Sequence, residues 1–235
     1  MAALIAFDTA TERMTIAVKG QGGQVWSHDG EGGAKASAAL LPAILGLLRD
    51  AGLRLTDLDA IAFGRGPGAF TGLRTACSVA QGLALGAGKP VLPIDSLLAV
   101  AEQARAGAAS YRVWAAIDAR MGQIYAAEYE HADGAWRTRV EPLLTDGEQL
   151  SSRWREQPPQ AIAGDALRSF SDRLQTFGAA LVPDAAPHAL ALLALAEGAW
   201  SRGDAVDPAL ALPLYVRDKV AQTTLERDAA RAERV

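Results

Sequence analysis

The sequence contains few of the residues that carry redox or metal chemistry. Its 235 residues include one cysteine and three histidines. A lone cysteine, Cys77, cannot form an intramolecular disulfide, and no histidine lies near it in the sequence. His28, His131 and His188 are far apart and form no His-x-x-x-His pair. We therefore predict no metal site and no catalytic residue.

Long apolar runs and an excess of positive charge are also missing. The longest apolar stretches, such as 189–196, fall well short of the roughly 20 residues that a membrane-spanning helix needs. The N-terminal residues are strand-like and lack a basic segment followed by a cleavable apolar one, so we expect a cytoplasmic protein without a membrane span. The formal charge of −4 is scattered along the chain. We expect contact with nucleic acid only through a partner.

Apolar residues make up half of the chain, which is enough for a large core. Their spacing predicts short strands that alternate with helices, as in an α/β protein with a mostly parallel sheet. In the first half, the predicted strands are 3–7, 14–19, 60–63 and 91–94, and the predicted helices are 37–51, 71–87 and one that begins near Ser96.

The second half of the chain repeats the opening pattern of apolar strand, aspartate, short loop and second strand. Asp118 follows its strand as Asp8 follows the first, which predicts an internal duplication with two lobes, 1–105 and 106–235. Beyond Trp136 the sequence predicts a strand, a second strand at 161–163 and helices at 166–177 and 187–202. A charged tail occupies 218–235.

The segment 64–74 is rich in glycine and joins a buried strand to a helix. Gly64, Gly66, Gly68 and Gly72 permit backbone conformations or close approaches that other residues do not, and Pro67 fixes one φ angle. We predict a structural loop, with Thr71 as the cap of the next helix. The amides of such a loop suit either an anion or a closely packed backbone. The segment does not match a dinucleotide-binding or a Walker phosphate loop.

Aspartate at a strand end, followed by small hydroxyl residues and a hairpin, resembles the phosphate loop of the actin, sugar-kinase and heat-shock ATPase superfamily. Asp8, Thr9 and Asp118 are the candidate nucleotide-binding residues by this resemblance. Ala10 and Arg120 depart from the superfamily pattern. Because aspartate also caps turns by accepting bonds from nearby amides, we favour the structural role.

Helix 71–87 is rich in alanine and glycine, so its faces are smooth. A face of small side chains can pack closely against the chain's own sheet or against a helix of another subunit. The sequence leaves both alternatives open.

Four motifs together resemble the TsaB (YeaZ) family, over residues 2 to about 217. The motifs lie at 7–11, 64–74, 116–125 and 213–217. The resemblance implies a duplicated actin-like fold (ASKHA, ribonuclease H-like) with mixed central sheets. It also implies a non-catalytic subunit of the complex that makes N6-threonylcarbamoyladenosine at adenosine 37 of tRNAs reading ANN codons. In that family, the partners are TsaD, which carries the chemistry, the ATPase TsaE, and a second copy when the protein is alone.

The resemblance also suggests where the partner would bind. The candidate interface residues are Ser37, Leu40, Leu41, Ile44, Arg65, Phe70, Thr71, Arg74, Ala76 and Ala80. ATP or ADP with magnesium is expected only at the interface with partner subunits, and tRNA only through the complex. Many members of the family have histidine where this chain has Ala36. Two other functions stay open: an ATP-dependent small-molecule kinase of the same superfamily, and a hydrolase like the M22 metallopeptidases.

Overall fold

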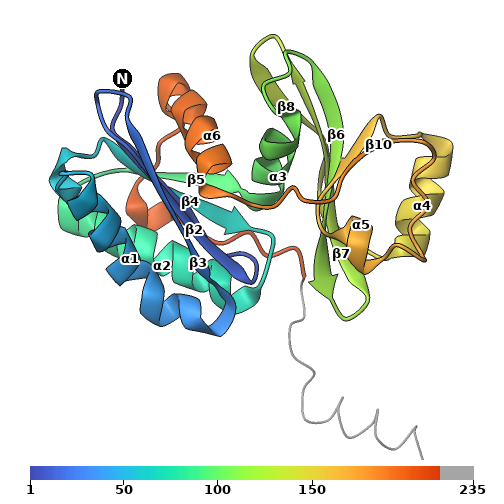
Figure 1. Cartoon of the computed structure of the whole chain (residues 1–235), viewed down its shortest axis with the longest axis horizontal. Coiled ribbons are helices and arrows are strands. Elements are labelled where there is room, and N and C mark those ends of the chain that lie inside the picture. The colour runs from blue at the N-terminus through green and yellow to red at the C-terminus, as the bar shows by residue number, and fades with distance from the viewer. Residues whose placement is uncertain (218–235) are drawn as a thin grey trace, which may run out of the picture.

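The computed structural model describes residues 1–217, which form two lobes that lie side by side (Figure 1). The first lobe is built on a five-stranded mixed sheet with the strand order β3-β2-β1-β4-β5. Its strands are β1 (Leu4–Asp8), β2 (Arg13–Lys19), β3 (Val25–Glu31), β4 (Ala60–Gly66) and β5 (Val91–Asp95). The helices of this half are α1 (Ala36–Asp50), α2 (Phe70–Ala87) and α3 (Ser96–Arg105), with short 3-10 turns η1 (Gly33–Lys35) and η2 (Leu55–Asp57).

The second lobe repeats this architecture on a sheet with the order β10-β9-β6-β7-β8. Its strands are β6 (Tyr111–Arg120), β7 (Gln123–Ala132), β8 (Ala135–Thr145), β9 (Ala161–Ala163) and β10 (Ala180–Val182). The helices of this half are α4 (Gly147–Glu156), α5 (Ala166–Ser169) and α6 (Ala189–Arg202), followed by the 3-10 turn η3 (Pro208–Leu210).

The two sheets have the same topology, strand for strand. In the first, β1 pairs antiparallel with β2 and parallel with β4. In the second, β6 pairs antiparallel with β7 and parallel with β9. Each half of the chain also runs strand, strand, strand, helix, strand, helix, strand, helix. The predicted duplicated α/β fold with mixed sheets is therefore confirmed. The mostly parallel sheet predicted from the alternation of strands and helices is wrong, because the first three strands of each half pair antiparallel as consecutive hairpins.

The third helix of each half packs on the sheet of the other half. Residues of α3, including Leu97 and Val100, join the core on β6 and β7. Residues of α6, including Leu192 and Ala196, cover β1 and β4 of the first sheet. The predicted boundary between residues 105 and 106 stays a prediction. Helix α6 lies in the second half of the sequence and packs on the first sheet.

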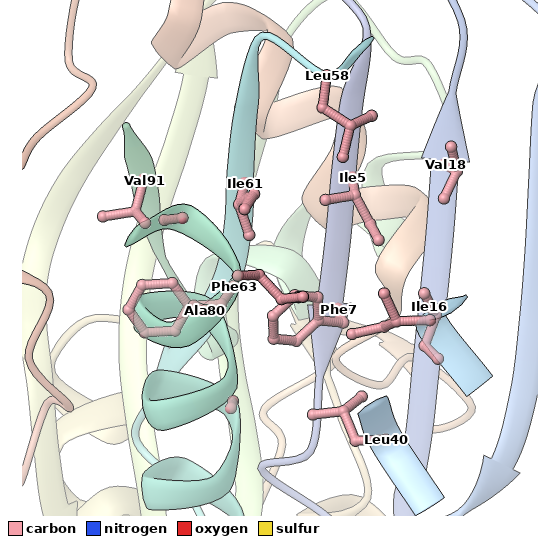
Figure 2. Close-up of a cluster of buried hydrophobic side chains, with 14 of the residues drawn as sticks. Ile5, Phe7, Ile16, Val18, Leu40, Leu58, Ile61, Phe63, Ala80 and Val91 are labelled. Carbon is pink, nitrogen blue, oxygen red and sulfur yellow. The ribbon is translucent and has the colours of Figure 1, made fainter. Parts of the chain in front are cut away.

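Strand β1 is buried at every residue because helices cover both faces of its sheet. Side chains alternate along a strand, so Ile5 and Phe7 point toward α1 and α2 while Leu4 and Ala6 point toward α6. Figure 2 shows Ile5 and Phe7 in the first core, which is the buried cluster between this sheet and helices α1 and α2. Asp8, the last residue of β1, is buried with the rest of the strand.

Several predicted elements differ from the structure. The helix predicted at 166–177 ends at Ser169, and α4 and β10 were not predicted. Strand β4 continues to Gly66, so the strand contains the first part of the glycine-rich segment. Thr71 is not the cap of α2: the N-cap is Ala69, and no side chain caps this end. The predicted charged tail, 218–235, lies outside the described residues.

Candidate functional site

Asp8 ends β1 in a turn that its own carboxylate closes. Its Oδ1 accepts a hydrogen bond from the amide of Ala10 at 2.6 Å, and its Oδ2 accepts one from the hydroxyl of Ser96 at 2.7 Å. The side chain is buried, and this burial raises the pKa of Asp8 above its usual value despite both bonds. The turn-capping role inferred from the sequence is confirmed for Asp8. Ser96 was not predicted as its partner, since a serine after a strand end carries no signal of a contact so far along the chain.

The glycine-rich segment packs backbone to backbone against this turn. A Cβ at Gly64 would lie 1.7 Å from Oδ2 of Asp8, and a Cβ at Gly72 would lie 1.8 Å from the carbonyl oxygen of Thr9. A Cβ at Gly68 would lie 2.5 Å from the carbonyl oxygen of Ala10. No side chain fits at these distances, which explains why glycine occupies these positions.

Hydrogen bonds join the two backbones at the same place. The hydroxyl of Thr9 donates to the carbonyl of Gly72 at 2.7 Å, and the amide of Ala69 donates to the carbonyl of Ala10 at 2.7 Å. Gly66 has a φ of 111° and lies against Leu73, and Pro67 next to it is buried. The chain's own backbone therefore fills the space beside Asp8 and Thr9, where the superfamily resemblance places a phosphate.

The second lobe has an equivalent turn at Asp118. Its Oδ1 accepts from the amide of Arg120 at 2.7 Å, and its own amide donates to Oδ1 of Asp165 at 2.9 Å. The guanidinium of Arg120 pairs with Glu12 of the first lobe at 2.8 Å. Turn capping is thus confirmed for Asp118 as well. Asp165 lies just after β9 and accepts this bond from the end of β6, and the sequence did not predict its role.

A cleft of about 320 Å³ opens between the two lobes. It is lined by Asp118, Arg120 and the β1–β2 turn, but not by Asp8 or Thr9. Two ion pairs cross or border it, Glu12 with Arg120 and Arg168 with Asp184. The three candidate nucleotide-binding residues therefore do not line one open cleft.

Metal-ligating residues do not gather within residues 1–217: no group of three or more His, Cys, Asp or Glu side chains there could hold a metal ion. His188 caps α6 by accepting from the amide of Leu190, and His131 lies against the carbonyl of Ala109. Cys77 is buried, which raises its thiol pKa. No helix among the same residues has the length and apolar character to span a bilayer.

Four of the candidate interface residues are buried in the first core. Leu40, Ile44, Ala76 and Ala80 are each 0% exposed. Figure 2 shows Leu40 and Ala80 pointing into the cluster around Phe7 and Phe63. Their prediction as contacts for a partner is wrong, because Leu40 and Ile44 of α1 and the two alanines of α2 pack in the core on the chain's own sheet. Ala36 is buried as well.

The remaining candidates lie at or near the surface. Ser37 and Leu41 of α1 and Thr71 and Arg74 of α2 are exposed, and Phe70 is half-buried. Arg65 is half-buried, and its guanidinium pairs with Asp95 at 2.5 Å. We use the term outer face for a set of nine exposed residues on the two neighbouring helices, which excludes the last turn of α1 with Arg49 and Asp50. Its members are Ser37, Ala38, Leu41 and Leu45 of α1 and Thr71, Arg74, Ser78, Gly82 and Leu85 of α2.

The segment after η3 ties the outer part of the first lobe to the second lobe. The amide of Leu214 donates to the carbonyl of Arg65 at 2.7 Å, and Tyr215 accepts from Nε of Arg74 at 3.1 Å. Farther along, Arg217 donates to the carbonyl of Ala119 at 3.1 Å. The motif at 213–217 therefore contacts both the glycine-rich segment and the β6–β7 turn.

Known proteins resemble this chain over nearly its whole length. A family model described as "TsaD: tRNA N6-adenosine threonylcarbamoyltransferase" matches residues 31–165. The tRNA threonylcarbamoyladenosine biosynthesis protein TsaB of Escherichia coli is 34% identical, over 93% of this chain and 96% of that protein. The chain belongs to the TsaB family. The TsaB protein of Haemophilus influenzae is 33% identical over 92% of this chain and 94% of that protein.

A solved structure of a TsaB-family protein shares the fold. YeaZ from Pseudomonas aeruginosa is 38% identical and has a TM-score of 0.82, over 92% of this chain and all of that chain. The family resemblance predicted from the four motifs is therefore confirmed.

Proposed function

We propose that this protein is a non-catalytic subunit of the cytoplasmic machinery that forms threonylcarbamoyladenosine in tRNA. Its task is to bind and stabilise a TsaD-type subunit, which carries the chemistry. Relatives that match nearly the full chain are named for this biosynthesis, which supports the pathway. In this proposal, tRNA reaches the protein only through the complex.

The filled phosphate position is the observation that carries the non-catalytic role. An ATP-dependent kinase of this superfamily needs an open site at the first strand end. Here Asp8 is buried and bonded to Ser96, and Gly68 and Gly72 lie against the carbonyls of Ala10 and Thr9. A phosphate cannot reach Asp8 without displacing α2, whose first turn is part of the core. We therefore propose that ATP or ADP with magnesium binds only where partner subunits complete a site.

The outer face is the surface that we propose for the TsaD-type subunit. Small residues such as Ala38, Ser78 and Gly82 allow a partner helix to approach closely, and Leu41 and Leu45 supply exposed apolar area. The same surface would serve a homodimer when the partner is missing, and a TsaE-type ATPase would join the assembled pair. Two helices that already pack on one sheet need little rearrangement to dock.

Binding of the TsaD-type subunit from the same organism tests this proposal. Ser78→Arg places a long cation in the middle of the outer face, and we expect it to abolish co-purification and a measurable Kd. The matched control is Ser152→Arg, which puts the same side chain on an exposed position of α4 in the other lobe. Both variants should fold, because both serines face solvent. Equal binding by the two variants would place the interface elsewhere.

A further inference from the structure

The outer face carries a single charge. Residues 36–48 of α1 contain no charged residue, and Arg74 is the only one in the whole of α2. Most exposed helices have many charged side chains, but here the only other charges on the two helices are Arg49 and Asp50 in the last turn of α1. The placement of this arginine therefore calls for a physical reason.

Two aromatic rings hold Arg74 in place. Its guanidinium carbon lies 3.7 Å from the centroid of the Phe70 ring, one helical turn earlier. Its Nε donates to the hydroxyl of Tyr215, and the two ring centroids are 5.3 Å apart. A planar guanidinium over a ring loses little freedom on binding, because its orientation is already set.

The two terminal nitrogens of Arg74 remain available for a ligand. No carboxylate among residues 1–217 pairs with this guanidinium, although most arginines in that range have such a pair. Its Nε is used by Tyr215, which leaves the planar pair of Nη groups as donors in a forked arrangement. That geometry matches the two oxygens of a carboxylate.

A groove of about 410 Å³ surrounds this guanidinium at the junction of α1 and α2. Hydroxyl residues, two apolar side chains and one cation line it, and none of the lining residues is acidic: they are Ser37, Phe70, Thr71, Arg74, Thr75, Ser78 and Val79. The groove thus offers hydrogen-bond donors and positive charge. A partner that complements this groove would present an anionic group on an otherwise uncharged surface.

We propose that Arg74 binds the carboxylate of an aspartate or glutamate on a helix of the TsaD-type subunit, and that this contact selects the partner. The inference rests on the proposed function. Docking on the outer face covers the groove and removes water from Arg74, and a buried arginine without an anion is costly. A correct partner must therefore supply a carboxylate at this point, and a helix without one is rejected.

A second copy of this chain does not supply a carboxylate from its own outer face. In a twofold-symmetric dimer the outer face meets itself, and its only charge is again Arg74. Two such faces bring like charges together without a carboxylate between them. Charge complementarity thus favours the TsaD-type subunit over a second copy as the occupant of the groove.

Affinity for the purified TsaD-type subunit tests this inference on the full chain. We expect Arg74→Ala to weaken Kd about 30-fold, as for a central arginine hot spot, and Arg74→Glu to weaken it about 100-fold or more. Arg74→Lys keeps the positive charge but loses the two parallel N–H donors of the guanidinium. It should therefore weaken Kd less than the other two substitutions, by about 5-fold. Tyr215→Phe removes the bond that positions Arg74 and should weaken binding about 3-fold.

The matched control is Arg173→Glu, which reverses another exposed arginine that lies over a phenylalanine, Phe170, in the second lobe. It should bind like the unmodified protein. Salt provides a readout that a purely structural role would not move: raising NaCl from about 50 to about 300 mM should weaken the unmodified complex more than the Arg74→Ala complex. Replacing the partner's acidic residue by arginine should restore binding to Arg74→Glu.

The outcomes separate this inference from the proposed function. If Ser78→Arg abolishes binding while Arg74→Glu binds within about 3-fold of the unmodified protein, the carboxylate contact is refuted and the docking face stands. If neither substitution matters, the outer face is not the interface and both proposals fail. Loss of self-association with unchanged heterodimer affinity in Arg74→Glu would assign the arginine to a second copy and also refute the inference.

Discussion

A single added methyl group at Gly72 should disrupt the contact between the glycine-rich segment and the Asp8 turn. Gly72 lies in the first turn of α2, and a Cβ there would lie 1.8 Å from the carbonyl oxygen of Thr9. The neighbour is backbone in a buried turn, so no flexible side chain can move aside. Gly72→Ala therefore forces α2 and the turn apart by more than an ångström, or breaks the local backbone geometry.

Two effects of the substitution oppose each other in free energy. Alanine is the better helix former by about 1 kcal/mol, which favours the variant. Overpacking a tight site costs about 1–3 kcal/mol or more, and loss of the Thr9 hydroxyl bond to Gly72 costs about another 1 kcal/mol. The steric term is the largest because the clash is backbone against backbone. We expect a net loss of about 3 kcal/mol in the free energy of unfolding.

Gly82 in the same helix provides the control. It is exposed, and a Cβ there would meet nothing within 4 Å. Gly82→Ala should therefore raise the free energy of unfolding by about 0.5–1 kcal/mol through helix propensity alone. Urea denaturation followed by circular dichroism measures both variants against the unmodified protein. If Gly72→Ala is as stable as Gly82→Ala, the close packing described for this segment is refuted.

Two further predictions concern buried groups. Burial raises the pKa of Asp8 from 3.8, so the stability that this group contributes is complete below that value and is lost as pH rises through the folded pKa. Asp8→Asn should thus gain stability relative to the unmodified protein as pH increases from about 4 to about 8 in urea titrations, and a difference that does not change with pH would contradict this cause. Cys77 is buried and its pKa is raised, so a thiol reagent should label it far more slowly in the native protein than in denaturant; equal rates would show that the thiol is open to solvent.

The sequence predicts the elements whose residues carry a periodic apolar pattern. Strand β1 and helix α6 are apolar over most of their length, and α1 has leucines and isoleucine at helical spacing. The aspartates that follow equivalent strands, Asp8 and Asp118, predict the duplication. The structure places both in turns of the same kind, because each closes its turn by accepting from the amide two residues later.

Other features depend on contacts that a local pattern does not contain. Helix α4 has only two large apolar residues, Leu150 and Trp154, although Asp146 before it is a recognisable N-cap. The packing of α3 and α6 against the sheet of the other half depends on tertiary contacts, since each helix follows a strand of its own half in the sequence. The bond from Ser96 to Asp8 joins the ends of two strands of one sheet, and the two residues are 88 positions apart in the sequence.

The direction of the smooth face of α2 was the main error in the predicted site. Small residues occur all around this helix, so alanine alone does not indicate which side faces inward. Leu73 and Leu83 are both buried, and Ala76 and Ala80 lie between them on the same stripe. The spacing of these two leucines indicates that both alanines face the core and that Ser78 and Gly82 face outward.

The central claim is that the backbone of this chain fills the position at which the resemblance to the ATPase superfamily predicts a phosphate. Calorimetric titration of magnesium ATP into the isolated protein tests it most directly. We expect no saturable heat up to millimolar nucleotide. Saturable binding of one nucleotide per chain that weakens in Asp8→Asn and in Asp118→Asn would contradict the claim, because it would require an open phosphate site between the two lobes.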